Sequence, residues 1–289
     1  MTLPLVSIVL PTYNRASRLP AAIESCLAQT YTNIELIVVD DGSTDATPQV
    51  LARFAEKDRR VRIIRQQNQR LPRALNAGFH ASRGAFLTWT SDDNRYRPNA
   101  IALMVEALQS NPSVGLVYCD FDRVDDTGRL IQRVQLPGPE MLPHRNCVGP
   151  CFLYRREVFQ AIGDYDPRHE LAEDYDYWLR VYSRFAIMHL EGVSPYEYGV
   201  HAGAMSAREV AVEDAAVRVR IKNARRIPAK LVVYVESRPY LADVCLKHGL
   251  GRRALAASLV ATGARPWSPE RWRRLASALR AAMLARHKG

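Results

Sequence analysis

The sequence predicts an α/β fold in which helices cover both faces of a mostly parallel sheet. Short apolar runs alternate along the first 113 residues with stretches whose apolar residues recur every three or four positions. This alternation is typical of parallel sheets. The chain has 289 residues, of which 47% are hydrophobic and 24% charged, which is ordinary for a soluble globular protein with a large core. The composition therefore excludes intrinsic disorder, a fibrous repeat and a small disulfide-stapled domain.

Strands and helices follow one another in the first half of the chain. The expected strands are short apolar runs, at residues 6–10, 35–39, 61–64 and 85–90. The expected helices have apolar residues at helical spacing, in 16–29, in the segment that carries Val50, Leu51 and Phe54, in 73–82 and in a segment opened by Pro98.

The pattern changes after Val114. Residues 114–121 and 129–134 flank an Asp-Asp-Thr-Gly turn and predict a hairpin. Residues 135–150 are rich in Pro and Gly and predict a loop. A strand at 151–154 and a helix at 173–185 follow, and the chain is expected to be helical from about residue 206. We therefore divide it into an α/β domain, 1–205, with halves at 1–113 and 114–205, and a helical region, 206–289.

Positive charge is concentrated in the helical C-terminal region. Residues 208–289 hold eighteen Lys and Arg against six Asp and Glu, a net charge of +12, whereas the first 207 residues sum to −2. Within Arg271–Lys288, one apolar stripe is flanked by arginines and consists of Trp272, Leu275, Leu279, Ala282 and Met283. A basic amphipathic helix of this kind either lies on an anionic membrane surface or packs against protein, on the α/β domain or on the second subunit of a homodimer.

Cysteine usage and the absence of a leader predict a cytoplasmic protein, peripheral on the inner face of the membrane if the basic helix binds lipid. The five cysteines are odd in number and widely spaced, which indicates reduced thiols. No apolar run approaches the ~20 residues of a membrane span, and Met1–Val9 lacks a signal peptide. Cys147 and Cys151 lack the second pair that a zinc site needs.

Carboxylates follow the predicted strands at the places where ligands bind in open α/β sheets. Asp40 and Asp41 follow the second strand, and Asp92 and Asp93 follow the fourth. A third acidic pair, Glu173-Asp174, opens a later helix. Clustered acids repel one another unless a cation bridges them, so we expect a divalent metal, Mn²⁺ or Mg²⁺, which commonly also holds a diphosphate.

Four motifs together resemble family 2 glycosyltransferases. In order, they are Val6-Ser-Ile-Val-Leu-Pro-Thr-Tyr-Asn14, Ile37-Val-Val-Asp-Asp-Gly-Ser43, Thr90-Ser-Asp-Asp-Asn94 and Ala172-Glu-Asp-Tyr-Asp-Tyr-Trp178. The resemblance covers about residues 4–205. It implies a GT-A fold, with a nucleotide-sugar half and an acceptor half, and transfer with inversion from a UDP- or dTDP-sugar to a glycan or lipid-linked acceptor. The product would be a cell-surface polysaccharide or glycoconjugate.

The resemblance also implies a nucleotide site. The loop after the first strand would lie against the base, through Pro11, Thr12 and Tyr13, with the aromatic face of Tyr13 available for stacking. Asp41, or Asp40 in its place, would accept a hydrogen bond from the N3–H of uracil or thymine. Arg73 lies where the family often places a basic residue near the nucleotide, and it would offset phosphate charge.

The metal motif departs from the family pattern. Asp93 matches the final acid of the family's Asp-x-Asp motif and is the expected metal ligand, with Asp92 assigned to the nucleotide side. Because Ser91 precedes them, one carboxylate or both could reach the metal. His201 matches a histidine that closes the metal or diphosphate site, although Gly199 replaces the usual arginine two residues before it.

The fourth motif carries the expected catalytic groups. Asp174 matches the general base that takes the proton of the acceptor hydroxyl, and Glu173 would orient or tune it. Asp176 and Arg180 are expected to form an ion pair on the helix surface. Trp178 would either stack on the acceptor sugar or belong to the core.

Two other functions compete with this one. A nucleotidyltransferase acting on sugar phosphates also uses a carboxylate-held metal, but its first loop would be Gly-rich, whereas Pro11–Arg15 contains no glycine. A non-enzymatic nucleic-acid binder would explain the basic region, but that region lacks the interleaved aromatics of a stacking platform. We therefore expect no nucleic-acid partner.

Overall fold

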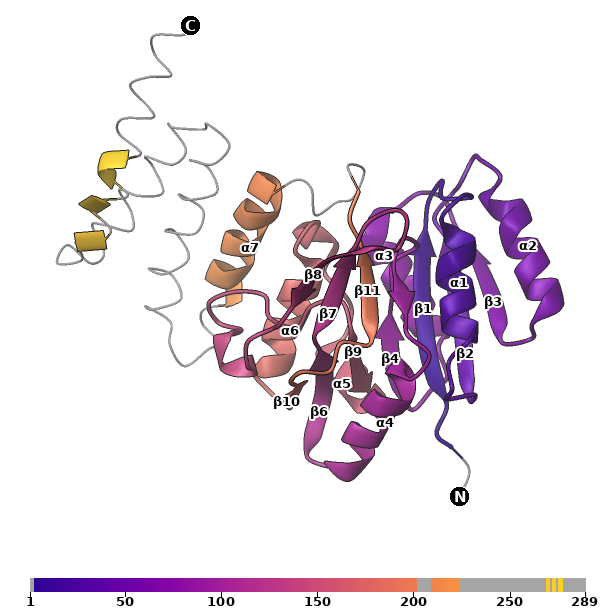
Figure 1. The fold of residues 1–289 in the computed structure, drawn as a ribbon, viewed down its shortest axis with the longest axis horizontal. Helices are drawn as coiled ribbons and strands as arrows, with labels where there is room; N and C mark the ends of the chain where they lie inside the picture. Colours follow the sequence, from indigo (N-terminus) through magenta and orange to yellow (C-terminus); the bar gives the residue numbers. More distant parts are fainter. Residues whose placement is uncertain (1–2, 202–208, 224–268, 271, 274, 278–289) are drawn as a thin grey trace, which may run out of the picture. The chain divides into compact units, whose positions relative to one another are not determined.

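The computed structural model describes residues 3–201, 209–223, 269–270, 272–273 and 275–277. Figure 1 shows the fold, coloured along the sequence. The chain divides into two compact units. The first unit comprises residues up to 140, 147–168 and 184–201. The second comprises 141–146, 169–183 and the chain from 202 onward. Residues 141–146 and 169–183 thus group with the C-terminal region, although the sequence-based division counts them in the α/β domain.

A seven-stranded sheet forms the centre of the first unit. Its strands, in chain order, are β1 (Val6–Thr12), β2 (Ile34–Asp40), β3 (Val61–Arg65), β4 (Phe86–Trp89), β6 (Val114–Cys119), β9 (Phe152–Arg155) and β10 (Ala186–Leu190). Across the sheet their order is β10-β6-β9-β4-β1-β2-β3. Every neighbouring pair is parallel except the two that β9 makes, with β4 and β6. The predicted α/β fold with a mostly parallel sheet is confirmed.

Helices cover both faces of this sheet, as the burial of both side-chain sets requires. They are α1 (Leu19–Leu27), α2 (Thr47–Lys57), α3 (Arg70–Ala81), α4 (Ala100–Ser110) and α5 (Arg156–Ile162). Ile8 and Leu10 pack in one core cluster with residues of α1, α2 and α4. Val9, on the opposite face of β1, contacts α3 so closely that a Cβ on Gly78 would lie 2.3 Å from its Cγ1. The side chains of β1 alternate between the two faces of the sheet and therefore pack in the apolar core on each face.

A second, four-stranded sheet has the order β5-β11-β7-β8. Its strands are β5 (Arg95–Tyr96), β7 (Phe121–Val124), β8 (Leu130–Val134) and β11 (Tyr196–Gly199). The predicted hairpin is wrong in one respect: its first strand is two strands, β6 and β7, in different sheets, and only β7 pairs with β8. The break falls at Asp120, whose buried carboxylate accepts hydrogen bonds from the amides of Leu136 and Gly192.

The second unit contains α6 (Glu173–Tyr182) and α7 (Glu209–Asn223). Helix α6 ends three residues earlier than predicted. Two short 3-10 turns lie at Pro139–Met141 and Pro167–His169. Strands β5, β10 and β11 and helix α5 were not predicted, because they are two to seven residues long and have no clear apolar period.

Most of the predicted membrane-surface helix, 271–288, lies outside the described residues. Of its apolar stripe, Trp272 is 52% exposed and Leu275 is buried. In the part of the chain that is described, no helix is both long and apolar enough to cross a membrane. The four described cysteines, at positions 26, 119, 147 and 151, are buried and form no disulfide.

Candidate active site

The carboxyl ends of β1, β2 and β4 meet at one edge of the large sheet. Thr12, the last residue of β1, pairs in register with Asp40, the last residue of β2. Trp89, the last residue of β4, pairs with Val9 of β1. Because the three strands are parallel and adjacent, the loops that follow them lie together, as predicted for the acidic motifs.

Asp92 is bound by Thr12, the last residue of β1, and by Arg15, which follows the strand. Its Oδ2 accepts a hydrogen bond from Thr12 Oγ1 at 2.7 Å, and its Oδ1 lies 3.7 Å from Arg15 Nε. Burial raises the pKa of Asp92 to about 6; the Thr12 hydroxyl and Arg15 act against this, and the charge of Asp93 adds to it. The two oxygens of Asp92 thus face Thr12 and Arg15 at the end of β1, which supports the assignment of Asp92 to the nucleotide site.

Asp93 contacts His201 directly. Its Oδ2 lies 2.8 Å from His201 Nε2, and both side chains are largely buried. The contact depends on the close approach of β11 to the loop after β4, where Gly199 N donates to Asn94 Oδ1 at 2.9 Å. A Cβ on Gly199 would lie 2.4 Å from the backbone oxygen of Asp93. A side chain at position 199 would therefore require the Asp93 backbone to move.

Replacing Gly199 with alanine is therefore expected to separate the Asp93 loop from β11. The new methyl group would force the Asp93 backbone away and lengthen the contact between Asp93 and His201. We expect metal-dependent donor binding to weaken by about 10-fold, the lower range for displaced metal-site partners. Isothermal titration with a nucleotide sugar and Mn²⁺ measures this, with Gly138→Ala as control, because Gly138 has no positive φ and a Cβ there meets only the end of the flexible Glu140 side chain. Unchanged affinity for Gly199→Ala would contradict the packing argument.

The Asp93–His201 pair fits a divalent metal. Adjacent ligands of an octahedral cation at about 2.1 Å lie about 3.0 Å apart. The 2.8 Å between Asp93 Oδ2 and His201 Nε2 is close to this value. One carboxylate oxygen and one imidazole nitrogen could therefore occupy neighbouring positions on the same ion, and phosphate and water oxygens would fill the rest.

Asp41 holds the loop that leads into α3. Its carboxylate accepts hydrogen bonds from Gln66 Nε2 at 2.7 Å and from the amides of Gln69 at 2.9 Å and Arg70 at 2.8 Å. Arg70 has a positive φ of 69°, and these bonds hold that strained turn. Asp41 is buried, and these three bonds fill three of the about four acceptor positions of a carboxylate.

Asp40 and the other expected nucleotide contacts differ in exposure. Asp40 is buried; its Oδ1 accepts from the Ser43 amide at 2.9 Å, and its Oδ2 lies 3.5 Å from Arg65 Nε. Pro11 is buried, whereas Tyr13 is 46% exposed. Arg73 is exposed on the first turn of α3. Tyr13 and Arg73 are thus accessible to a ligand.

The second unit carries the expected catalytic pair at the first turn of α6. Asn146 Nδ2 donates to Asp174 Oδ2 at 2.9 Å. Burial raises the pKa of Asp174. Burial, with the neighbouring charge of Asp174, also raises the pKa of Glu173, whose Oε2 has no hydrogen-bond partner among the described residues. Leu171, just before the helix, has a positive φ of 73°, a local strain often found near functional groups.

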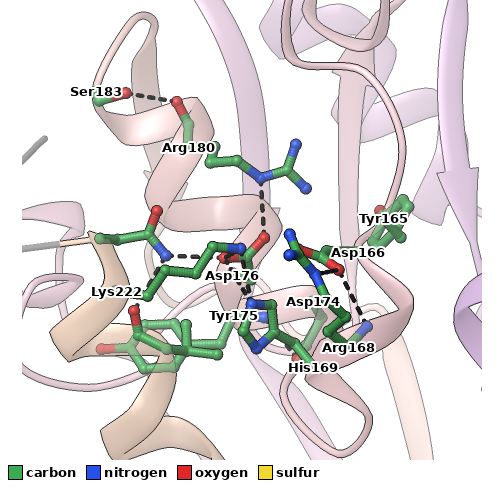
Figure 2. Close-up of polar contacts among 12 residues, drawn as sticks. Tyr165, Asp166, Arg168, His169, Asp174, Tyr175, Asp176, Arg180, Ser183 and Lys222 are labelled. Atoms are coloured by element: carbon green, nitrogen blue, oxygen red, sulfur yellow. Dashed lines mark hydrogen bonds and ion pairs between the residues drawn. The ribbon is translucent and has the colours of Figure 1, made fainter.

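Two expectations for α6 need correction. Trp178 is fully buried, so its ring presents no free face to a sugar, and it belongs to the core. Asp176 does pair with Arg180, at 2.9 Å, but the carboxylate is 0% exposed rather than on the surface. Figure 2 shows Arg180 and Lys222 pointing toward Asp176. The helical period gave the correct pairing, but it could not reveal that α7 covers this face.

Sequence reasoning missed several residues of both sites. Arg15 directly follows the first motif and Asn94 ends the third, so their positions could have indicated them, whereas Asn146 lies in a loop without a motif. Of the predicted residues, the structure brings together Thr12 with Asp92 and Asp93 with His201 in the first unit. It places Glu173 and Asp174 side by side in the second.

Comparisons with known proteins agree with the predicted resemblance. The profile described as glycosyl transferase family 2 matches residues 7–163, a little over half of the chain. An uncharacterized glycosyltransferase of Rickettsia prowazekii is 34% identical over 191 residues, which cover 62% of this chain and 59% of that protein. A PGL/p-HBAD biosynthesis glycosyltransferase of Mycobacterium bovis is 32% identical over 205 residues, which cover 69% of this chain and 79% of that protein. The chain thus spans about three fifths of the Rickettsia relative.

Two solved structures share the fold. Residues 1–349 of S. aureus TarS match with a TM-score of 0.68 at 16% identity, over 93% of this chain and 82% of that one. The mannosyltransferase PcManGT from Pyrobaculum calidifontis, in complex with GDP-Man and Mn²⁺, matches with a TM-score of 0.65 at 20% identity, over 97% and 86%. These likenesses confirm the predicted GT-A type of fold. From the family profile and the sequence relatives, the chain belongs to glycosyltransferase family 2.

Proposed function

We propose that this protein is a metal-assisted inverting glycosyltransferase that uses a UDP- or dTDP-sugar as donor and a hydroxyl of a glycan or lipid-linked compound as acceptor. The contact between Asp93 and His201 carries the proposal, because it brings a carboxylate and an imidazole close enough to serve as adjacent metal ligands at the ligand-binding edge of the sheet. Family membership selects this activity over a nucleotidyltransferase and a nucleic-acid binder.

Asp93 and His201 would hold the metal. When bound, the ion would supply positive charge to the departing nucleoside diphosphate. We expect Mn²⁺ to serve better than Mg²⁺, because an imidazole ligand suits the softer ion. The Pyrobaculum mannosyltransferase, whose structure contains Mn²⁺, supports this choice. Thr12 and Arg15 hold the neighbouring Asp92, so Asp93 would bind the metal while Asp92 would order the first loop.

Asp174 would act as the general base. Inversion proceeds by a single displacement: the acceptor oxygen bonds to the anomeric carbon, the bond to the diphosphate breaks, and a carboxylate takes the hydroxyl proton. A raised pKa makes Asp174 a stronger base, while Glu173, buried beside it, retains its proton more readily. Burial thus raises the pKa of both carboxyl groups, and neighbouring carboxyl groups with shifted pKa values are typical of acid–base sites in enzymes.

Nucleotide preference is the part of the proposal that a binding panel tests most simply. The remaining acceptor position of Asp41 would receive the N3–H of uracil or thymine, whereas cytosine presents an acceptor there. UDP and UDP-GlcNAc are bound in structures of TarS, and GDP-Man in the mannosyltransferase. We expect UDP and dTDP to raise the melting temperature with Mn²⁺ more than CDP does. Preferential stabilisation by CDP in a thermal-shift panel would refute this assignment.

The acceptor belongs to a surface polysaccharide or glycoconjugate in this proposal. The Mycobacterium bovis relative, named for PGL/p-HBAD biosynthesis, supports a glycoconjugate product. A lipid-linked acceptor would also account for the basic C-terminal region, whose charge of +12 would attract an anionic membrane surface.

A further inference from the structure

The second unit contains a buried carboxylate that the proposed chemistry does not use. Asp176 lies on α6, two residues after Asp174, and is 0% exposed. Its Oδ2 accepts a hydrogen bond from Arg180 Nε on the same helix. Its Oδ1 accepts from Lys222 Nζ at 3.0 Å and Asn223 Nδ2 at 2.8 Å, and these two residues end α7. The carboxylate therefore joins the first turns of α6 to the last turn of α7.

Separating α7 from Asp176 of α6 would be energetically unfavourable. An ionised carboxylate without partners is costly to bury. Burial alone would raise the pKa of Asp176, but hydrogen bonds from Asn223 and the charges of Arg180 and Lys222 outweigh it and hold the pKa below its usual value. Asp176 is thus ionised, and α7 supplies both hydrogen bonds to one of its two oxygens.

Helix α7 also contacts Tyr175, the residue of α6 between Asp174 and Asp176. The buried guanidinium of Arg220 lies over the ring of Tyr175, 5.9 Å from its centroid. It also pairs with Glu213 at 2.5 Å and donates to the backbone carbonyl of His144. Arg220 therefore ties α7 both to α6 and to the segment 141–146.

The segment 141–146 completes the arrangement around the expected base. Tyr175 OH donates to the carbonyl of Leu142 at 2.7 Å, and Asn146 Nδ2 donates to Asp174 at 2.9 Å. Asp174 is thus held by its own hydrogen bond with Asn146 and by the contacts of Tyr175 and Asp176, the next two residues of α6. Helix α7 contacts the segment and both of those residues.

We infer that Lys222 and Asn223 are positioning residues, through which helix α7 clamps the first turn of α6 and fixes the orientation of Asp174. The inference rests on the proposed function, in which Asp174 is the general base. It gives the start of the basic C-terminal region a role within the protein itself, separate from any membrane contact.

The test compares Lys222→Met and Asn223→Ala with a matched control on the same helix. Arg218→Ala removes a basic side chain of α7 that pairs only with Asp214 among the contacts described and is 62% exposed. Lys222→Arg serves as the conservative rescue. For each full-length variant, kcat, the donor KM, the pH profile and hydrogen exchange of the amides of residues 173–177 are measured. Should Asn223→Ala fail to fold, Lys222→Met carries the test, because Lys222 is partly exposed.

Lys222→Met and Asn223→Ala are expected to lower kcat by about 10- to 100-fold, the cost of a small misplacement of a catalytic group, with donor KM unchanged. Water reaching Asp174 would also move the acid limb of the pH profile to lower pH, and the amides of 173–177 would exchange faster. Arg218→Ala and Lys222→Arg should match the parent in all four measurements. Parental kcat and parental exchange in the folded variants would overturn the clamp. If the amides exchange faster in these variants but Asp174→Asn is fully active, Asp174 is not the general base. The restraint of α6 by α7 is then still supported.

Discussion

Asp174→Asn is expected to lower the rate of sugar transfer by about 10²–10⁴-fold, the usual contribution of a general base, and to leave donor binding intact. The amide has the same shape as the carboxylate and can still pair with Asn146, but it cannot take a proton. Steady-state transfer rates and donor titration with Mn²⁺ separate the two effects. Transfer at the parental rate by Asp174→Asn would show that the base lies elsewhere.

Glu173→Gln is the matched control for this prediction. Burial and the charge of Asp174 raise the pKa of Glu173, so this side chain favours its neutral form, which glutamine resembles. We expect the variant to retain transfer within a few fold. In the parent, transfer should be lost as the pH falls through the raised pKa of Asp174, since only the deprotonated base is active, and at a higher pH than an exposed aspartate would give.

Asp93→Ala is expected to reduce metal-dependent donor binding by about 100-fold or more, because the loss of a direct ligand should exceed the 10–100-fold cost of losing an outer-shell partner. His201→Ala should weaken the same binding in the same direction. Isothermal titration of a nucleotide sugar with and without Mn²⁺ measures both variants.

The first unit offers a matched control for Asp93→Ala. His80 Nε2 and Asp164 Oδ1 form another His–Asp pair at 2.8 Å, but both side chains are more than half exposed. Asp164→Ala removes a carboxylate that lies as close to a histidine as Asp93 does to His201. Mn²⁺-dependent donor binding by this variant should remain parental. Equal losses in the two variants would indicate a general effect on folding rather than a metal site.

Much of the first unit and its acidic edge could be predicted, because local patterns encode them. Apolar runs located β1, β2, β3 and β4, and the parallel direction of β1, β2 and β4 follows from their alternation with helices. Once these strands are adjacent, the residues after them must share an edge. The common edge of the acidic motifs could therefore be predicted, whereas the contact of Asp92 with Thr12 depends on the strand order β4-β1-β2, which the sequence pattern did not provide.

The remaining features depend on contacts between residues far apart in the chain. Asn146 reaches Asp174 across 28 positions, and Asn223 reaches Asp176 across 47. No period or motif within a short window records such a contact. The same holds for the burial of Trp178, because its helical spacing fits a core residue and an exposed platform equally well.

The most direct test of the account is the release of free nucleoside diphosphate from UDP- and dTDP-sugars by the full-length protein in the presence of Mn²⁺. The account predicts release that depends on the metal and that Asp93→Ala abolishes. No release from any nucleotide sugar, or equal release by Asp93→Ala or without a divalent metal, would contradict it.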